Sequence, residues 1–282
     1  MIEVLAPGPL ATVQDRGRPG WAAVGVSRSG AADGPGAALA NRLVGNDVGA
    51  AVIEATLGGL AVRFTAATLA VLTGARGPAT LDGRQIAHAA PFHAPAGSIL
   101  RLGAPARGLR TYLAVHGGID VPAVLGSRST DVLTGVGPER LAAGDRLTLG
   151  HAGGTVPGVD HAPVAEPELP PVLRLLPGPR LDWFAGDALR TLAGGAYTVT
   201  AASNRTALRL DGPPLARVVE RELAPEGLVP GAVQVPPDGR PVVFLVDHPV
   251  TGGYPVVAVL RHADLALAAQ VRPGDPVRFR RA

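Results

Sequence analysis

The chain of 282 residues contains neither cysteine nor lysine, and each absence excludes a group of functions. Without cysteine there is no disulfide, no thiolate nucleophile and no cysteine-ligated zinc site. Without lysine there is no Schiff-base catalysis, and the lysine-dependent phosphate binding of P-loop proteins and protein kinases is excluded as well. All 26 basic residues are therefore arginine.

Aromatic residues are also scarce, at five Phe, three Tyr and two Trp. The arginines are scattered along the chain, and the formal net charge is only +3. Nucleic-acid binding needs a concentrated basic surface and, for single strands, aromatic platforms for the bases. We therefore predict that the chain does not bind nucleic acid.

Long apolar runs are missing too. No uninterrupted apolar stretch reaches the ~18 residues that a membrane-spanning helix requires. The N-terminus, MIEVLAPGP, has an acidic residue at position 3 and early turn residues, which is unlike a signal peptide. The sequence thus predicts a cytoplasmic protein with no membrane partner.

Glycine (38 residues) and proline (28 residues) are abundant, and 46% of the residues are apolar, which together indicate an ordered chain with many turns. Runs of β-branched residues favour strands between these turns. A single longer helix is expected at 34–44, where Asp33 can cap the first turn and Gly45 can end the last. The strands are expected at 2–6, 51–56, 60–65, 68–73, 98–102, 111–116, 145–149 and 242–247.

The pattern restarts in the second half of the chain. LRLLPGPRLDWF (173–184) resembles IEVLAPGPLATV (2–13), with Pro-Gly-Pro after an apolar strand in both. Asp182 is expected to cap a short helix that ends at Gly194. Three segments are predicted: an N-terminal unit at 1–150 with an extra segment at 105–150, a linker at 151–171 rich in Gly, Pro, Ala and His, and a C-terminal unit at 172–282.

The densest polar motif is the loop before the predicted helix, TVQDRGRPG followed by GVSRSGAAD. A helix N-terminus offers free amide hydrogens and the positive end of a dipole, so it can hold an anion. Arg16, Arg18 or Arg28 could bind a carboxylate or phosphate through two parallel hydrogen bonds. The alternative is that the Asp and Arg side chains of the loop only pair with one another, with Asp33 serving as a cap.

A second polar cluster follows a predicted strand. Gly117 and Gly118 allow backbone amides to approach a ligand closely. Downstream, Arg128, Ser129 and Thr130 supply a positive charge and two hydroxyls. The alternative is a tight turn whose hydroxyls are bonded within the protein.

A third cluster, DHPVTGGYP, follows another apolar strand. The amides of Gly252 and Gly253 are candidates for an oxyanion hole in an amide-cleaving step. Asp247 is a candidate for acid–base work, but pairing with His248 is disfavoured because neighbours on a strand point to opposite faces. Gln234 lies between apolar residues, either as a buried ligand contact or as a core amide bonded within the protein.

The seven histidines show no HxH or HExxH spacing, so no metal site is predicted. The GxSxG elbow of α/β-hydrolases is absent, which disfavours that kind of catalytic triad.

As a set, these segments resemble the family of the 5-oxoprolinase C subunit, also called biotin-dependent carboxyltransferase, allophanate hydrolase subunit 2 or KipA. The loop DHPVTGGYP departs from the family's usual DRQTTGGYP, which leaves the substrate of this member open. The matching stretches follow the family's order over nearly the whole chain: TVQDRGRPG (12–20), GVSRSGAAD (25–33), ANRLVGN (40–46), YLAVHGGIDVPAVLGSRSTD (112–131), GAVQVPPDGRPVVFLVD (231–247), TGGYP (251–255) and AQVRPGDPVRF (269–279).

The resemblance implies a mainly β fold made of two cyclophilin-like barrels in tandem. It implies a complex with the KipI-like B subunit of 5-oxoprolinase and with its A subunit, which opens 5-oxo-L-proline to L-glutamate with ATP, bound on this chain or on another one. Biotin is carried on lysine, so it cannot be attached covalently to this chain. The catalytic candidates are Arg16, Arg128 and Asp247. The candidates for binding the cyclic amide are Asp15, Ser29, Asp33, Asn41, Gly117, Gly118, Ser129, Thr130, Gln234, Gly252, Gly253 and Tyr254.

Two alternative functions follow from the same family. One is the carboxyltransferase subunit of a biotin-dependent urea or amide carboxylase. The other is a non-enzymatic, KipA-like regulator that binds a KipI-like kinase inhibitor. The catalytic base, the oligomeric state and the activity of the isolated chain stay open at this point.

Overall fold

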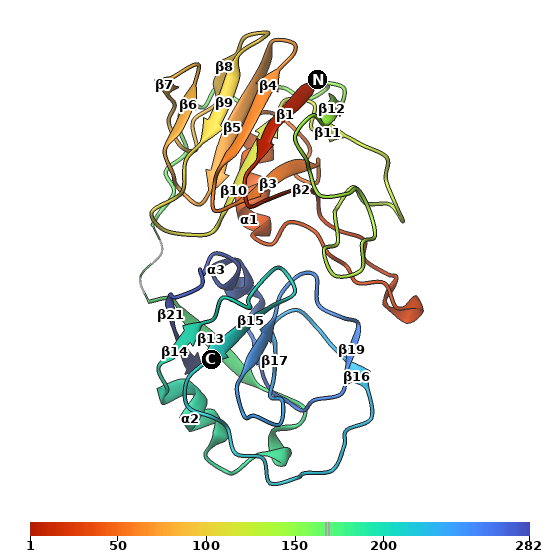
Figure 1. The fold of residues 1–282 in the computed structure, drawn as a ribbon, viewed down its shortest axis with the longest axis vertical. Coiled ribbons are helices and arrows are strands. Elements are labelled where there is room, and N and C mark those ends of the chain that lie inside the picture. The colour runs from red at the N-terminus through yellow and green to blue at the C-terminus, as the bar shows by residue number, and fades with distance from the viewer. Residues whose placement is uncertain (167, 169) are drawn as a thin grey trace. The chain divides into compact units, whose positions relative to one another are not determined.

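The computed structural model describes residues 1–166, 168 and 170–282 (Figure 1). Its internal contacts divide the chain into two compact units. The first unit comprises Met1–Arg18 with Ser29–Ala165, and the second comprises Pro19–Arg28 with Glu166–Ala282. In the part of the chain that is described, three short α-helices accompany many strands, which confirms the prediction of a mainly β protein.

The first unit contains two antiparallel sheets. The order of the larger sheet is β11 (Ile119–Asp120), β12 (Arg146–Leu149), β1 (Ile2–Pro7), β4 (Leu60–Phe64), β9 (Ile99–Leu102), β6 (Ala79–Leu81) and β7 (Arg84–Gln85). The order of the smaller sheet is β2 (Leu10–Gln14), β3 (Val52–Thr56), β10 (Arg110–Val115), β5 (Thr68–Gly74) and β8 (Phe92–Ala94).

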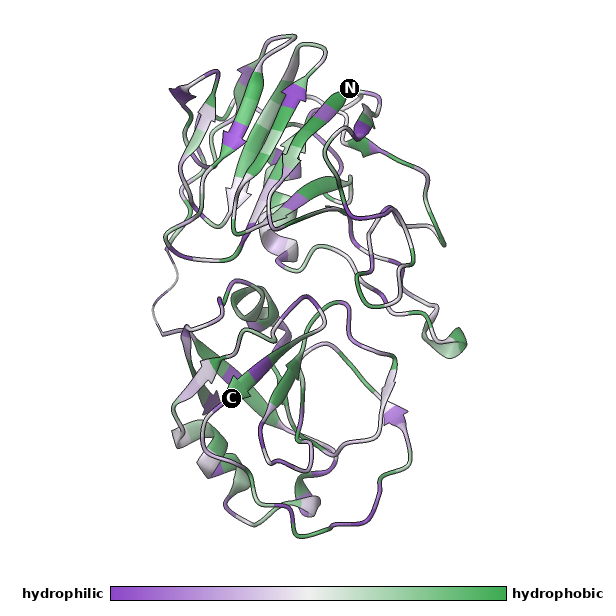
Figure 2. Cartoon of the chain, viewed as in Figure 1, coloured by the Kyte–Doolittle hydropathy of each residue, from purple (hydrophilic) through white to green (hydrophobic). Residues whose placement is uncertain are grey.

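Both sheets of the first unit contribute to one apolar core. Val4 and Leu100 of the larger sheet and Ile53 and Leu113 of the smaller sheet are fully buried in it. Hydrophobic residues are concentrated along these strands in Figure 2. Burying each such side chain contributes roughly 1.5–3 kcal/mol, so the shared core joins the two sheets.

Helix α1 (Gly34–Leu43) covers one face of the smaller sheet, where it contacts β5 and β10. Asp33 caps the helix, because its Oδ1 accepts a hydrogen bond of 2.9 Å from the Gly36 N–H. Ala40 and Leu43 are buried against the sheet. Gly45, with φ +71°, follows the last turn. The helix predicted at 34–44 is therefore confirmed.

The second unit is a closed barrel in which β13 and β21 pair in parallel and the other neighbours are antiparallel. Its order is β13 (Val172–Pro177), β20 (Val256–Leu260), β17 (Ala232–Gln234), β18 (Val242–Phe244), β15 (Ala207–Asp211), β14 (Tyr197–Val199) and β21 (Pro276–Arg281). A separate two-stranded ladder joins β16 (Glu226–Gly227) to β19 (Thr251–Gly252). Two further helices are α2 (Ala188–Gly194) and α3 (Leu265–Ala269).

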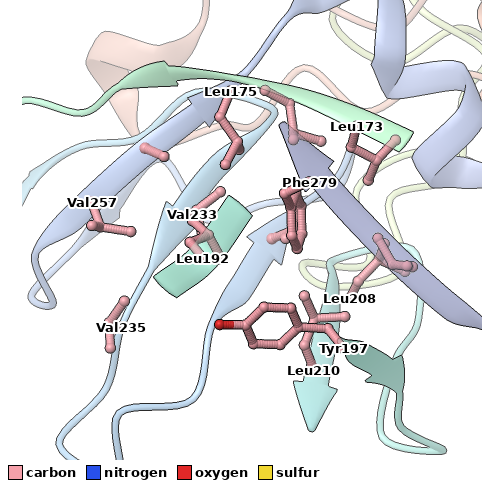
Figure 3. Close-up of a cluster of buried hydrophobic side chains, with 14 of the residues drawn as sticks. Leu173, Leu175, Leu192, Tyr197, Leu208, Leu210, Val233, Val235, Val257 and Phe279 are labelled. Carbon is pink, nitrogen blue, oxygen red and sulfur yellow. The ribbon is translucent and has the colours of Figure 1, made fainter. Parts of the chain in front are cut away.

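The interior of the barrel is filled by side chains, as Figure 3 shows. Leu173 and Leu175 of β13 point into it, together with Phe279 of β21 and Leu192 of α2. Tyr197 meets Phe279 edge to face, with ring centroids 5.7 Å apart. The barrel is therefore a packed core, and ligand contacts must come from its loops.

Three details differ from the expectations from sequence. The strand expected at 242–247 ends at Phe244, and Asp247 lies in the following turn. Asp182 caps no helix: it lies inside a 3-10 turn, after which Phe184 is extended, and α2 starts at Ala188. In the segment 151–171, residues up to Ala165 group with the first unit rather than forming a free linker.

Candidate functional site

The Asp15 carboxylate is the centre of a hydrogen-bond network in the first unit. Its Oδ1 accepts hydrogen bonds from the Ser127 and Ser129 hydroxyls, both at 2.6 Å, and from the Gly17 N–H at 2.7 Å. Its Oδ2 accepts one from the Arg128 N–H at 2.6 Å. With this many donors, Asp15 acts as an anchor that joins the loop after β2 to the loop that carries Arg128.

A second set of bonds joins the same two loops. Gln14 Nε2 donates to the Thr130 carbonyl at 2.9 Å, and the Ser29 hydroxyl donates to the same oxygen at 3.2 Å. The Thr130 N–H donates to the Val13 carbonyl at 3.0 Å. Ser29 holds this place with φ +51°, a conformation uncommon outside glycine. The structure thus joins Gln14 and Ser29 of the first sequence cluster to Thr130 of the second within the first unit. Residues 19–28 of the first cluster group with the second unit.

The arginines of these loops have different environments. Arg18 is 1% exposed and donates to the Ser129 and Val124 carbonyls. Arg16 and Arg28 are exposed. Arg128 Nη2 pairs with Asp120 Oδ1 at 2.7 Å, and both side chains are about half exposed. Exposed ion pairs contribute only ~0–1 kcal/mol, so the Arg128–Asp120 pair adds little to stability.

A buried network behind the SGAAD segment was missed from the sequence. Glu54 Oε2 accepts from the Ala32 N–H at 3.0 Å and from the Tyr112 hydroxyl at 2.9 Å. The Tyr112 oxygen in turn accepts from the Asp33 N–H at 2.7 Å, and Arg110 Nε lies 3.4 Å from Glu54 Oε1. Burial, reinforced by the Glu54 charge, raises the pKa of Tyr112 well above its ordinary value. The only sequence signal was a glutamate inside the apolar strand VIEAT.

Of the remaining candidates of the first unit, Gly117 and Gly118 form a turn, and Asn41 of helix α1 is joined to it through Asn46. Asn41 Oδ1 accepts from Asn46 Nδ2 at 3.1 Å, and Asn46 Oδ1 accepts from the Gly117 N–H at 2.8 Å. Gly117 and Gly118 have φ of +91° and +71°, and a Cβ on Gly117 would collide with the Gly150 carbonyl oxygen. Backbone geometry therefore accounts for both glycines.

In the second unit, Asp247 forms a buried ion pair with Arg205. The two side chains are 0% and 1% exposed. Arg205 Nε donates to Asp247 Oδ2 at 2.9 Å and Nη2 donates to Oδ1 at 3.1 Å. The Asp247 N–H also donates to the Arg205 carbonyl at 3.2 Å. With both oxygens occupied by a guanidinium, Asp247 fits a structural role better than the catalytic one expected from sequence.

The diglycine of the third cluster lies beside Gln234. Gln234 is 3% exposed, and its Nε2 donates to the Tyr254 carbonyl at 2.8 Å. Gly252 is the last residue of β19 and is paired with Glu226. Gly253 is exposed, as is Tyr254, at 46%. Gln234 is therefore an interior amide that holds the exposed end of this loop.

No group of three or more His, Asp or Glu side chains among the described residues has the arrangement of a metal site. Every described helix is too short or too polar to span a membrane.

The chain is a mainly β protein of two units, a two-sheet unit followed by a closed barrel. Each unit has glycine-rich polar loops and a buried arginine–carboxylate pair that supports them. Residues 24–281 match the family described as carboxyltransferase domain, subdomain A and B. The chain belongs to this family.

Individual relatives cover almost the whole chain. It is 39% identical to the 5-oxoprolinase C subunit of Escherichia coli (strain K12), over 99% of this chain and 90% of that protein. It is 34% identical to urea amidolyase of Lachancea kluyveri, over 99% of this chain but 17% of that protein. The crystal structure of TTHA0988 has a TM-score of 0.91 at 38% identity, covering 99% of this chain and 55% of that one. The chain thus spans about half the length of this structural relative.

Proposed function

We propose that the chain is the C subunit of an ATP-dependent 5-oxoprolinase, which hydrolyses 5-oxo-L-proline to L-glutamate together with the A and B subunits. The observation that carries the proposal is the 39% identity to a 5-oxoprolinase C subunit that this chain matches over 90% of its length. ATP is the co-substrate of the complex, and the cytoplasm is the proposed location.

The polar loops carry the kinds of groups that this reaction needs. Amide resonance protects a lactam carbonyl, and phosphorylation of the amide oxygen by ATP would remove that resonance and create a leaving group. The protein must then orient the ring and stabilise negative charge on oxygen. Arg128 and Arg16, on loops fixed by Asp15, are our candidates for the substrate carboxylate and the developing charge.

The urea amidolyase relatives favour a second candidate, transfer of a carboxyl group from biotin to an amide. Because this chain has no lysine, the biotin would be carried by another chain. A pocket for the cyclic ureido group of biotin and a pocket for a five-membered lactam have similar shape requirements, so one fold can serve both reactions.

Co-expression with candidate A and B subunits separates the two candidates. The 5-oxoprolinase proposal predicts glutamate release from 5-oxoproline that requires ATP. Carboxyl transfer predicts incorporation of labelled bicarbonate into urea when a biotin carboxylase and a biotin carrier are added. The second result without the first would overturn our proposal.

A further inference from the structure

The loop 247–255 of the second unit, called here the diglycine loop, is held by buried side chains near both of its ends. At its start, the side chain of Asp247 accepts two hydrogen bonds from Arg205, and its backbone N–H bonds the Arg205 carbonyl. Near its end, Gln234 donates to the Tyr254 carbonyl at 2.8 Å. All three side chains are at most 3% exposed, so they lie beneath the loop rather than at its surface.

The two glycines of the loop differ in the space around them. A Cβ on Gly252 would lie 2.6 Å from Gln234 Nε2 and 2.8 Å from Leu228 Cδ1, so an alanine there would have to displace these two side chains. A Cβ on Gly253 would have the Leu223 carbonyl oxygen, at 3.6 Å, as its nearest neighbour. Gly253 follows the last paired residue of β19 and is exposed. The backbone of Gly253 is thus open to a ligand, whereas Gly252 is half-buried against Gln234 and Leu228.

We propose that Arg205, Asp247 and Gln234 are positioning residues that hold the diglycine loop so that Gly253 and Tyr254 face the cyclic amide. The identity of that substrate rests on the proposed function above. Asp247 then transfers no proton. It acts by neutralising Arg205 and fixing the turn in which the loop begins.

The pair can be removed as a unit, which separates positioning from chemistry. Asp247→Leu alone leaves the Arg205 charge buried and uncompensated, whereas Asp247→Leu with Arg205→Met removes both charges at similar volume. The reconstituted complex is assayed for glutamate release, and hydrogen exchange is measured at the amides of residues 250–254. Arg240→Met with Asp211→Leu is the matched control, because this Arg–Asp pair of the same unit is 3.2 Å apart and more than half exposed.

Positioning predicts that Asp247→Leu lowers kcat/KM at least tenfold and speeds exchange in the loop at least tenfold. The double variant should return both values to within about threefold of the parent, and the exposed control pair should change neither. A folded double variant that stays as inactive as the single one, with normal exchange, would overturn the proposal. That result would mean that the carboxylate itself is needed for the reaction.

Two further variants keep the test decisive. Asp247→Asn keeps the shape of the side chain: positioning predicts an unchanged acid limb in the pH profile of kcat/KM, whereas a general base predicts its loss. Gly253→Ala should raise KM at least fivefold and leave hydrogen exchange in the loop unchanged. An unchanged KM would contradict the proposal that Gly253 contacts the substrate. If the parent complex releases no glutamate, the proposed function fails, but the exchange data still test the positioning of the loop.

Discussion

Each unit of the chain contains a fully buried arginine–carboxylate pair, and the two pairs are built differently. In the second unit, both oxygens of Asp247 accept from Arg205. In the first unit, one oxygen of Glu54 accepts from a backbone N–H and from Tyr112, while Arg110 lies 3.4 Å from the other. The first pair is therefore part of a network that also holds the start of helix α1, and the second is a bidentate pair at the start of a loop.

The difference in connectivity determines how each pair responds to mutation. Breaking one partner of a buried pair costs about 3–5 kcal/mol, whereas replacing both partners by apolar residues is often neutral. Glu54 also accepts from the Ala32 N–H and from Tyr112, and these bonds are lost whatever replaces Arg110. We therefore expect a second substitution to rescue stability more fully in the second unit than in the first.

The largest effect is expected from Glu54→Leu. It should lower the free energy of unfolding by at least about 4 kcal/mol, because it isolates a buried charge and removes the acceptor of the Ala32 N–H. Adding Arg110→Met should recover less than half of the loss. Urea unfolding of the three proteins measures this, and full recovery would show that the network is not branched.

The next effect is expected at the second pair. Asp247→Leu should cost about 3–5 kcal/mol, and Arg205→Met in the same chain should bring the free energy of unfolding back to within ~1 kcal/mol of the parent. Urea unfolding followed by the fluorescence of the buried Trp183 of this unit provides the measurement. Equal losses in the single and double variants would contradict mutual charge compensation between Asp247 and Arg205.

The two glycine pairs give a smaller contrast. Gly117→Ala should lower the free energy of unfolding by about 1–2 kcal/mol or more, because φ is +91° and the Gly150 carbonyl leaves no space. Gly253→Ala should cost less than about 0.5 kcal/mol, since its Cβ would make only an ordinary contact, 3.6 Å from the Leu223 carbonyl oxygen. Thermal unfolding of both variants tests this. A large loss for Gly253→Ala would show that packing, rather than ligand access, requires glycine there.

The smallest effect concerns pH and the first unit. Burial, with the nearby charges of Arg76 and His161, lowers the pKa of His88 to about 4. Between the ordinary histidine pKa of about 6.5 and this value, the unfolded chain binds more protons than the folded one. The contribution of His88 to the free energy of unfolding is therefore fully present above pH 6.5. It is lost as the pH drops towards 4, which lowers the free energy of unfolding by ~1 kcal/mol after solvent screening. His88→Gln should flatten unfolding free energies measured across this range, and an unchanged slope would exclude His88 as the cause.

Local patterns predicted much of the fold. The strands around Val4, Ile53 and Leu113 follow from runs of apolar, β-branched residues between turns, and helix α1 follows from Asp33 and the spacing of its alanines. The strand expected to reach Asp247 ended early, because the buried pair with Arg205 holds that residue in a turn. No local pattern encodes such a pairing.

The candidate site was predictable as a set of loops but not as a set of contacts. Sequence placed Asp15 and Ser129 in separate clusters, and the structure bonds them across 114 positions. Glu54 was missed because a single carboxylate in an apolar strand carries no local sign of its partners. Gly117 and Gly253 look alike in sequence, and only φ and the surrounding atoms separate them.

Glutamate release is the most direct test of the central claim that this chain is the C subunit of a 5-oxoprolinase. The A and B subunits are assayed with 5-oxoproline and ATP, with and without this chain. We expect ATP-dependent glutamate release when the A subunit, the B subunit and this chain are all present. The release should be at least a hundredfold lower when this chain is omitted. Equal release with and without the chain, or none with all three folded and assembled, would contradict it.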